Sequence, residues 1–327
     1  MTRAIRATSV FIATTLLCLG GAQAQTPNFP TKPVKIVTPF SAGSGPDAAM
    51  RALGDLLSRK WGQPVIIDNK PGGNGFVATA PFKQAQPDGH ELIGLDSSHI
   101  TTHPHTFNKL PYNAQKDFEP IRPILLTDFY VVVAKDSPFN SLADIVAAAK
   151  AKPGHLTYGS WFVGSPGHLG ALRLESQTKI KMTHVPYKEM SQLYAGVSNK
   201  EVDWALGSAA SAGPMEKAGK LKFIGLGASK RSSIYPDAPS TDESPVTKGF
   251  ESSAWVGLFA PPGTPKAVKE KISADMREAL ATPMMQDRYR TLGYELMDLG
   301  PEQFAERIRK DGSIWKTVIQ EAGLKLD

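Results

Sequence analysis

Cysteine is almost absent from this sequence. Its one cysteine among 327 residues, Cys18, lies in an apolar run near the N-terminus. Loss of that run on export would leave no thiol, which excludes cysteine catalysis, disulfides and cysteine metal sites in the mature chain. No later apolar stretch approaches the roughly 20 residues that a membrane-spanning helix needs. The sequence therefore predicts a soluble exported protein without thiol chemistry.

A strong charge of either sign is missing too. The 37 Lys and Arg residues against 31 Asp and Glu give a formal charge of +6, and aromatic residues make up only 8%. No basic block is present, so nucleic acid is not expected as a partner. The length and the 41% hydrophobic content predict about two folded domains. The 29 glycines and 26 prolines predict many tight turns that can carry a site.

The first 24 residues read as a secretory signal peptide. Two arginines precede the apolar residues 10–19, and Ala22-Gln23-Ala24 has the small-x-small pattern of a cleavage site. The leucines before Cys18 do not fit a lipoprotein signal. Cleavage after Ala24 removes two arginines and no acid, which lowers the formal charge from +6 to +4. We therefore expect a mature protein in the periplasm.

Strand-like and helix-like segments alternate along the mature chain. Pro46 suits the first position of a helix, and Ser141 suits an N-cap. The β-loop-α-β order predicts two α/β lobes with largely parallel sheets. We expect strands at residues 34–38, 64–68, 91–95, 129–134, 156–158, 182–186, 202–206, 223–228 and 255–259, and helices at 46–61, 76–84, 141–151, 168–177 and, after residue 264, to the end.

One glycine loop imitates a dinucleotide-binding fingerprint. Gly43-x-Gly45-x-x-Ala48 lies between an expected strand and helix, with Asp68 some 20 residues later. Asp47 would then repel a pyrophosphate at the helix N-terminus. A smaller anion such as a carboxylate fits the exposed N–H groups better, with Asp47 accepting backbone N–H bonds to shape the loop. A nicotinamide-dependent oxidoreductase remains an alternative reading.

Two further groups suggest enzyme or metal chemistry. His99, His103 and His105 are close in sequence, but Pro104 should break the helix that a shared metal site would need, so we interpret them as surface or loop histidines. Ser165 with His168 resembles a nucleophile and base without the usual elbow motif, and His168 more plainly caps or packs a helix. A secreted hydrolase is therefore kept only as an alternative.

The sequence leaves two alternative roles open for the aromatic residues in loops. Trp161 and Phe162 stand in a Gly/Ser-rich loop, where they either fill the core or form a platform for a ligand. Tyr187 and Lys188 follow an expected strand, where the lysine either contacts an anion or is simply solvated.

A series of short motifs runs in one order through almost the whole mature chain. Each is weak alone, but their order and spacing are specific, and together they resemble the extracytoplasmic solute receptors of tripartite tricarboxylate transporters. The motifs are Val34-Lys35-Ile36-Val37-Thr38-Pro39-Phe40-x-x-Gly43-x-Gly45-x-Asp47, Gly62-Gln63-Pro64-Val65, Asn69-Lys70-Pro71-Gly72-Gly73-Asn74-Gly75, Pro87-Asp88-Gly89, Lys109-Leu110-Pro111-Tyr112, Ala151-Lys152-Pro153-Gly154, His184-Val185-Pro186-Tyr187-Lys188, Tyr235-Pro236-Asp237, Ala260-Pro261-Pro262-Gly263-Thr264-Pro265 and Glu321-Ala322-Gly323.

The resemblance implies a fold, a function and a set of site residues. The implied fold is an α/β, two-lobed periplasmic binding protein of type II, with a ligand cleft between a first lobe (28–127 plus 250–327) and a second lobe (128–249). The implied function is non-enzymatic capture of a small carboxylate for membrane transporter subunits, by a monomer without cofactor or metal. The candidate ligand-binding residues are Phe40, Ser41, Gly43, Ser44, Gly45, Asp47, Asp96, Ser97, Ser98, Trp161, Phe162, Gly164, Ser165, Gly167, His168, Tyr187, Gly207 and Ser208.

Five positions depart from the pattern of that family. Pro46 replaces a common threonine, Trp161 and Phe162 replace small residues, and Gly207 stands where an aspartate is frequent. These changes make the site more apolar or aromatic, so we expect an aromatic carboxylate or dicarboxylate rather than citrate. Asp96 stands where serine or threonine is common, and it adds an acceptor without a partner evident from the sequence. It could pair with an amide, hydroxyl or ammonium group of a ligand, which leaves an amino acid or an aromatic amide open.

Overall fold

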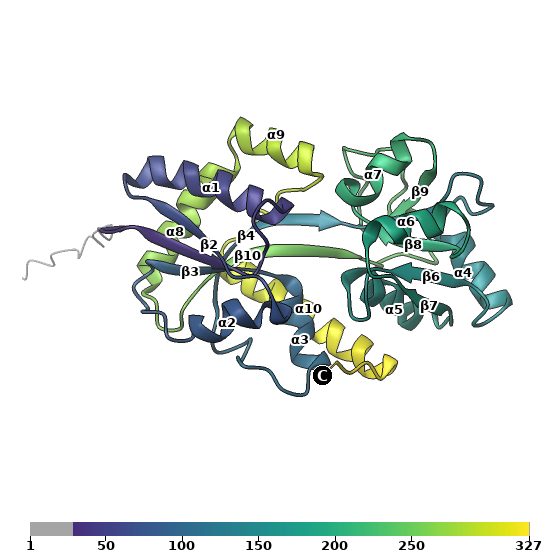
Figure 1. Ribbon diagram of the computed structural model, residues 1–327, viewed down its shortest axis with the longest axis horizontal. Coiled ribbons are helices and arrows are strands. Elements are labelled where there is room, and N and C mark those ends of the chain that lie inside the picture. The colour runs from purple at the N-terminus through teal and green to yellow at the C-terminus, as the bar shows by residue number, and fades with distance from the viewer. Residues whose placement is uncertain (1–28, 327) are drawn as a thin grey trace, which may run out of the picture.

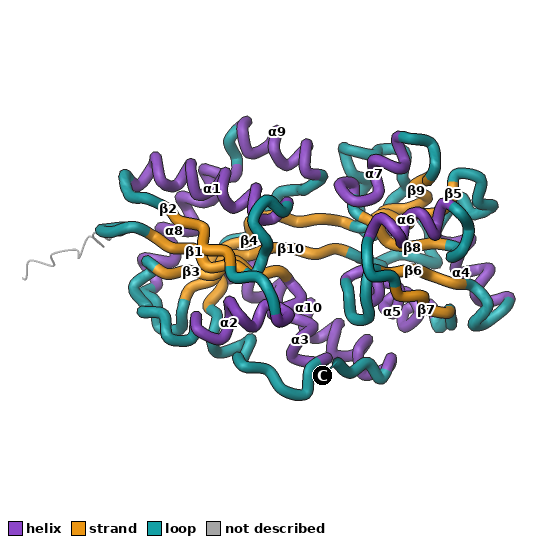
Figure 2. Tube along the Cα trace, viewed as in Figure 1, coloured by secondary structure: helices purple, strands orange, loops and turns teal. Residues whose placement is uncertain are grey.

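The computed structural model describes residues 29–326, and the expected signal peptide at residues 1–24 lies outside that range. Two five-stranded sheets form two separate lobes, each flanked by helices (Figures 1 and 2). In order, the first sheet contains β2 (Val65–Asn69), β1 (Val34–Thr38), β3 (Glu91–Asp96), β10 (Ser253–Ala260) and β4 (Glu119–Asp128), and the second contains β7 (Thr183–Pro186), β6 (Thr157–Ser160), β8 (Trp204–Gly207), β5 (Tyr130–Ala134) and β9 (Leu221–Leu226).

The helices divide between the two lobes as the sheets do. Local signals fix several of their ends: Ser141 forms a capping box with Asp144, as expected, and Gly62 ends α1 with a left-handed φ of 64°. The first lobe carries α1 (Gly45–Trp61), α2 (Phe76–Phe82), α3 (His103–Thr106), α8 (Lys266–Leu280), α9 (Pro283–Leu292) and α10 (Pro301–Ala322), and the second carries α4 (Leu142–Ala151), α5 (Pro166–Thr178), α6 (Met190–Ser198) and α7 (Ala209–Lys217).

Both sheets are mixed, so the expectation of largely parallel sheets was wrong. β1 pairs in parallel with β2 and β3, but β10 is antiparallel to both β3 and β4. In the second sheet β6 is parallel to β7 and β8, while β5 is antiparallel to β8 and β9. The antiparallel pairs arise because the chain passes from one sheet to the other and returns, so that β10 runs opposite to β4.

The strand directions place one edge of each sheet opposite the other. β4 ends at Asp128 and β5 begins two residues later in the second sheet, so β4 runs toward the second lobe. β1, β2 and β3 share its direction, because β10 is antiparallel to both β3 and β4. By the same reasoning β6, β7 and β8 run toward the first lobe. The carboxyl ends of both parallel sets therefore face each other between the lobes (Figure 1).

Each lobe has its own apolar core. One cluster of buried residues fills the second lobe around Val131, Tyr158 and Trp204. Two clusters fill the first lobe, one between its sheet and α1 and α8, the other around Phe82, Trp255 and Phe304. Separate cores allow each lobe to hold its shape by itself. The boundaries at 127/128 and 249/250 stay a prediction.

The C-terminal helix α10 touches both lobes. Near its middle, Asp311 accepts a hydrogen bond of 2.9 Å from Trp255 of β10, in the first lobe. Further along, the Arg173 guanidinium of α5 lies 5.9 Å from the centre of the Trp315 ring, and Ser176 of α5 donates a hydrogen bond to Glu321. The last turns of α10 therefore pack on the second lobe, although they follow the first lobe in sequence.

Candidate functional site

Asp47 lies at the centre of the loop between β1 and α1. Its side chain is buried, and its Oδ2 accepts hydrogen bonds from the Gly43 N–H at 2.8 Å and from Arg51 Nε at 3.0 Å. Asn69, at the end of β2, donates to Asp47 Oδ1 at 2.8 Å and to the Phe40 carbonyl at 3.0 Å. The expected bond to a backbone N–H is confirmed, whereas Arg51 and Asn69 were not foreseen.

These donors keep the Asp47 carboxylate charged. Burial alone would raise the pKa of Asp47, but the hydrogen bonds from Arg51, Asn69 and Gly43 lower it below its ordinary value. Asp47 is 1% exposed, and both of its carboxylate oxygens accept hydrogen bonds from within the protein. A negative charge fixed at this helix N-terminus opposes a pyrophosphate, so the structure gives no support to the dinucleotide reading of the Gly43-x-Gly45 pattern.

The first turn of α1 is shaped by a serine and a tyrosine. Ser44 is the N-cap, and its hydroxyl accepts from the Asp47 N–H at 3.4 Å. A Cβ on Gly45 would come 2.1 Å from the Tyr294 hydroxyl, so only glycine lets this ring lie against the helix start. Tyr294 follows α9, and burial raises its pKa to about 12. It was not among the expected site residues, because nothing in its local sequence marks it.

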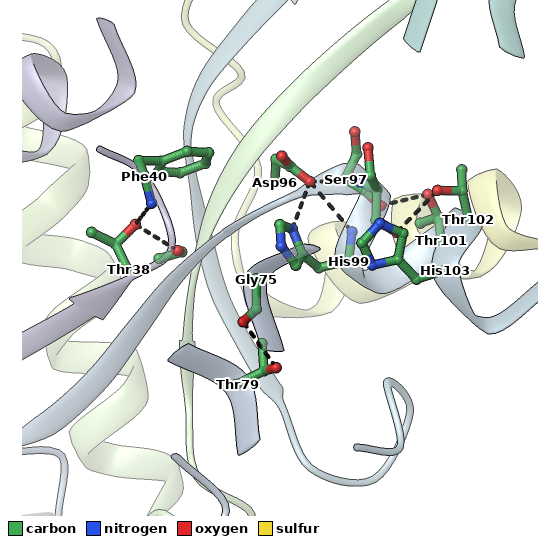
Figure 3. A network of polar contacts seen from close by, with 12 residues as sticks. Thr38, Phe40, Gly75, Thr79, Asp96, Ser97, His99, Thr101, Thr102 and His103 are labelled. Atoms are coloured by element: carbon green, nitrogen blue, oxygen red, sulfur yellow. Dashed lines mark hydrogen bonds and ion pairs between the residues drawn. The ribbon is translucent and has the colours of Figure 1, made fainter. Parts of the chain in front are cut away.

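Asp96 ends β3, next to the end of β1, and it has a clear partner. Its Oδ1 accepts from the Ser98 N–H at 2.9 Å, the His99 N–H at 3.3 Å and His99 Nδ1 at 2.8 Å (Figure 3). Burial would raise the pKa of Asp96, but the neighbouring His99 and its hydrogen bond lower it to about 2. Ser97 is mostly buried and Ser98 is half-buried in the same turn.

The expectation of surface or loop histidines was wrong for His99, and Pro104 does not break the helix. A wide helical turn (Ser98–Thr102) runs directly into α3, and Pro104 sits in the first turn of α3, where proline causes no break. His99 is 6% exposed, and its ring lies 5.0 Å from that of His103. Burial and His99 lower the pKa of His103 to about 4. His99 is therefore buried beneath the site, whereas His103 and His105 are half-buried.

The loop from β6 to α5 is closed by its own hydrogen bonds. Ser165 is fully buried as the N-cap of α5, and its hydroxyl accepts from the His168 N–H at 3.3 Å. His168 Nδ1 accepts from the Gly164 N–H at 2.9 Å, so its proton is on Nε2. Gly167 packs directly against the Trp161 ring. Ser165 and His168 therefore shape a helix start and do not form a nucleophile and base.

A second serine and histidine pair lies below this loop and is equally inert. The rings of His168 and His184 are stacked, with centres 3.9 Å apart. Ser160 Oγ lies 2.7 Å from His184 Nε2 and donates its single proton to the Phe162 carbonyl at 3.0 Å. His184 must then be the donor to Ser160, which is the reverse of a general base. Burial, aided by His184, lowers the pKa of His168 to about 4, so the stack is neutral at pH 7.

The two loop aromatics have opposite environments. Trp161 is 9% exposed, and its ring lies 5.9 Å from that of Phe129 within the second-lobe core. Phe162 is 55% exposed. Trp161 is therefore a core residue behind the loop, and an aromatic surface for a ligand rests on Phe162.

The remaining second-lobe candidates differ in their access to a ligand. Tyr187 is half-buried against Gly159 and Gly196. Gly207 is buried at the end of β8, where a Cβ would come 2.7 Å from the Tyr194 hydroxyl. Ser208 caps α7 in a reciprocal pair with Ser211. Gly207 is thus required by packing, and Ser208 holds the start of a helix.

The candidate residues gather at the facing carboxyl ends of the two sheets. Three of the parallel strands there lead directly into helices: β1 into α1, β6 into α5, and β8 into α7. Each helix has a serine N-cap, namely Ser44, Ser165 and Ser208. We call this region the interlobe site, made of residues 40–47, 96–98, 162–168 and 207–208. Helix N-termini are electropositive, and at α1 the Asp47 charge is paired with Arg51, so the backbone N–H groups of the region suit a small anion.

The described part of the chain has neither a candidate metal cluster nor a candidate membrane span. No group of three or more His, Cys, Asp or Glu side chains there is arranged to hold a metal ion. No helix in that part of the chain is long and apolar enough to cross a membrane.

Comparisons with known proteins agree on one family. A family model described as the tripartite tricarboxylate transporter family receptor matches residues 49–324. A UPF0065 protein of Bordetella pertussis is 31% identical over 314 residues, covering 96% of this chain and 97% of that protein. Protein BugT of the same organism is 24% identical over 100% of this chain and 99% of its own length.

Solved structures extend the likeness to the fold. The periplasmic binding protein BugD is 27% identical with a TM-score of 0.70, over 91% of this chain and 99% of that one. Rpa4515 of R. palustris, solved with adipate, is 25% identical with a TM-score of 0.74, over 91% and 99% of the two chains. MatC of Rhodopseudomonas palustris, solved with malate, is 28% identical with a TM-score of 0.70, over 89% and 100%.

Proposed function

Because the chain belongs to the tripartite tricarboxylate transporter family of receptors, we propose that it binds a small carboxylate at the interlobe site and delivers it to the membrane subunits of such a transporter. The family consists of periplasmic solute-binding receptors, so this protein is a receptor and not an enzyme. Two relatives of known structure hold the carboxylates adipate and malate. Those ligands support the carboxylate class for this chain.

The convergence of three serine-capped helix N-termini carries this proposal. α1 comes from the first lobe, whereas α5 and α7 come from the second, and all three begin at the facing strand ends. N–H and hydroxyl donors from both lobes would replace the water around a bound carboxylate. Binding would then not need an arginine or lysine. Closure of the lobes on the ligand would bring the two sets of donors together.

We propose further that the ligand is an apolar or aromatic carboxylate. The exposed Phe162 ring offers a face for stacking, and Pro46 in the first turn of α1 supplies no N–H. The citrate hydroxyl would find no partner against such a ring. The buried Trp161 adds rigidity behind the loop and no contact surface.

Competition between terephthalate and citrate tests the ligand class. We expect the wild type to bind terephthalate more tightly, because ring stacking adds about 0.5 to 1.5 kcal/mol beyond area burial. Phe162→Ala should weaken terephthalate about 2- to 10-fold and leave citrate unchanged in titration calorimetry. Val163→Ala, at a neighbouring residue that is 41% exposed, is the matched control. Tighter binding of citrate, or a Phe162→Ala effect below about 0.5 kcal/mol, contradicts the aromatic preference.

We propose that the protein is exported and acts as a monomer. Residues 1–24 have the pattern of a cleaved signal peptide, and +4 is the formal charge that cleavage leaves. The intact mass of protein recovered from the periplasm should match a chain that begins at Gln25.

Light scattering of that material should give the mass of one chain. A retained N-terminus, or a dimer mass, would show the respective expectation to be wrong.

A further inference from the structure

The Asp96 carboxylate uses only one of its two oxygens within the protein. All of its hydrogen bonds, from the Ser98 N–H, the His99 N–H and His99 Nδ1, end on Oδ1. Among residues 29–326, no hydrogen bond or ion pair of the structure ends on Oδ2. The Asp96 side chain is 29% exposed, so Oδ2 is within reach of a small molecule.

Capping of the turn after β3 and pairing with the buried His99 account for one oxygen of Asp96 and leave the other unexplained. The turn needs one acceptor oxygen at the Oδ1 position, and serine, threonine or asparagine supplies such an oxygen without a charge. Aspartate adds a second oxygen and a negative charge. The nearby His99 and its hydrogen bond lower the pKa of Asp96 to about 2, so that this charge persists at every physiological pH.

Asp96 stands inside the interlobe site rather than beside it. β3 pairs in parallel with β1, so the ends of the two strands, and with them Asp96 and the loop of residues 40–47, are neighbours. Figure 3 shows Asp96 and Phe40 at these adjacent strand ends, with Ser97 following Asp96. A ligand whose carboxylate is held at the helix N-termini would therefore present another part of itself to Asp96.

A free carboxylate oxygen distinguishes ligands by what they present to it. An N–H donor of the ligand would form a charge-assisted hydrogen bond with Oδ2. A second ligand carboxylate would place two like charges together in a partly desolvated site, which is unfavourable. Asp96 thus attracts ligands that present an N–H donor and repels ligands that present a second carboxylate.

We propose that Asp96 is the specificity-determining residue of this receptor, and that it selects a carboxylate bearing an N–H donor, as a primary amide or an ammonium group, over a dicarboxylate. This inference rests on the proposed function, because it assumes that the interlobe site captures one carboxylate of the ligand. Asp96 would separate aromatic carboxylates that bear an N–H donor from aromatic dicarboxylates, although both classes would stack equally well on the Phe162 ring.

Titration calorimetry with ligands of one shape tests the proposal. Terephthalate and 4-carbamoylbenzoate differ by one group, and 4-(aminomethyl)benzoate replaces the amide with an ammonium. Adipate and its monoamide repeat the comparison on a flexible chain, in case a rigid ring places its second group badly. For wild type we expect the donor-bearing member of at least one pair to bind 10-fold or more tightly than the dicarboxylate.

The Asp96→Asn variant turns the second side-chain acceptor into a donor and keeps the acceptor that caps the turn. Its side-chain carbonyl can accept the three bonds now made to Oδ1, and its NH2 replaces Oδ2 as a donor. The preference should then fall by at least 10-fold or reverse toward the dicarboxylate. Asp96→Ser, which keeps an acceptor and lacks the second oxygen, should abolish the preference and serves if the asparagine variant does not fold. Asp55→Asn, an exposed site on α1, controls for net charge.

The outcomes separate this inference from the proposed function. Equal affinities for both members of each pair in wild type, or a preference for the amide that Asp96→Asn and Asp96→Ser leave unchanged, overturns the role of Asp96 while the carboxylate receptor stands. Failure of wild type to bind any of these acids, or any other carboxylate, overturns the receptor proposal and the role of Asp96 with it.

Discussion

Replacing Asp128 with asparagine is expected to stabilise the protein most at pH 8 and progressively less as the pH falls toward 4. Asp128 is the last residue of β4, where the chain leaves the first sheet, and it lies opposite Ser253 of β10. Burial raises the pKa of its carboxyl to about 7; Glu295 and Glu251 add to this, and Arg307 opposes it. Neutral asparagine would remove the cost of a charge at this crossing.

The sign of the pH dependence follows from where the proton is held. Between the ordinary pKa of 3.8 and the folded-state value of about 7, the folded chain keeps a proton that the unfolded chain has lost. The free energy of unfolding from this group therefore falls as the pH rises through that interval, and the full penalty is present above pH 7. A shift of this size corresponds to at most about 4 kcal/mol.

Thermal or urea unfolding at several pH values between 5 and 8 measures this effect. The difference between wild type and Asp128→Asn isolates Asp128, because the other titrating groups are common to both proteins. Asp287→Asn, at an exposed acid of α9, is the control and should follow wild type. If Asp128→Asn and wild type give parallel pH profiles, the carboxyl is not protonated in the folded state and the expectation is wrong.

Replacing Asp47 with alanine is expected to weaken carboxylate binding at least tenfold and to lower the free energy of unfolding by about 2 to 4 kcal/mol. The substitution leaves the Gly43 N–H, the Asn69 amide and the Arg51 guanidinium without the acceptor that they share. The loop of residues 40–47 would lose its anchor to β2 and α1. Its donors would then no longer be held ready for a ligand.

Calorimetry with a bound carboxylate and urea unfolding together test the role of Asp47. Asp55→Ala, on the exposed face of the same helix, removes an equal charge and should change neither measurement by more than about 0.5 kcal/mol. An anion in direct contact with Asp47 would be repelled by it, and the alanine variant would then bind more tightly. Tighter binding would therefore show that Asp47 touches the ligand.

Elements with local signals were predictable from the sequence, and β4 was not. Pro46, Gly62 and Ser141 mark helix ends through preferences of the backbone itself, and the structure places each as expected. β4 contains Pro120 and Pro123, which argue against a strand. It forms nevertheless, because it is an edge strand whose prolines lie at two register shifts of its pairing with β10.

The candidate site shows the same division. The loop of residues 40–47 and the turn at residues 96–98 could be placed at strand ends from their order in the chain. The partners that define their chemistry could not, because Asn69 is 22 residues from Asp47 and Tyr294 is far from Gly45. The environments of Trp161 and Phe162 also differ through packing alone. The two residues are adjacent and both aromatic, but Trp161 packs near Phe129 and Phe162 is exposed to solvent.

The path of α10 restricts how the lobes can move. The lobes are joined by β4 and β10, which lie side by side, and the last turns of α10 make a third support against α5 through Arg173 and Trp315. Gly293, directly after α9, also lies against Ala209 and Ala210 of α7 in the second lobe. Lobe movement that keeps these contacts would have to pivot close to them and to the paired strands. Sliding or twisting of one lobe against the other would have to break the Arg173 and Trp315 contact first.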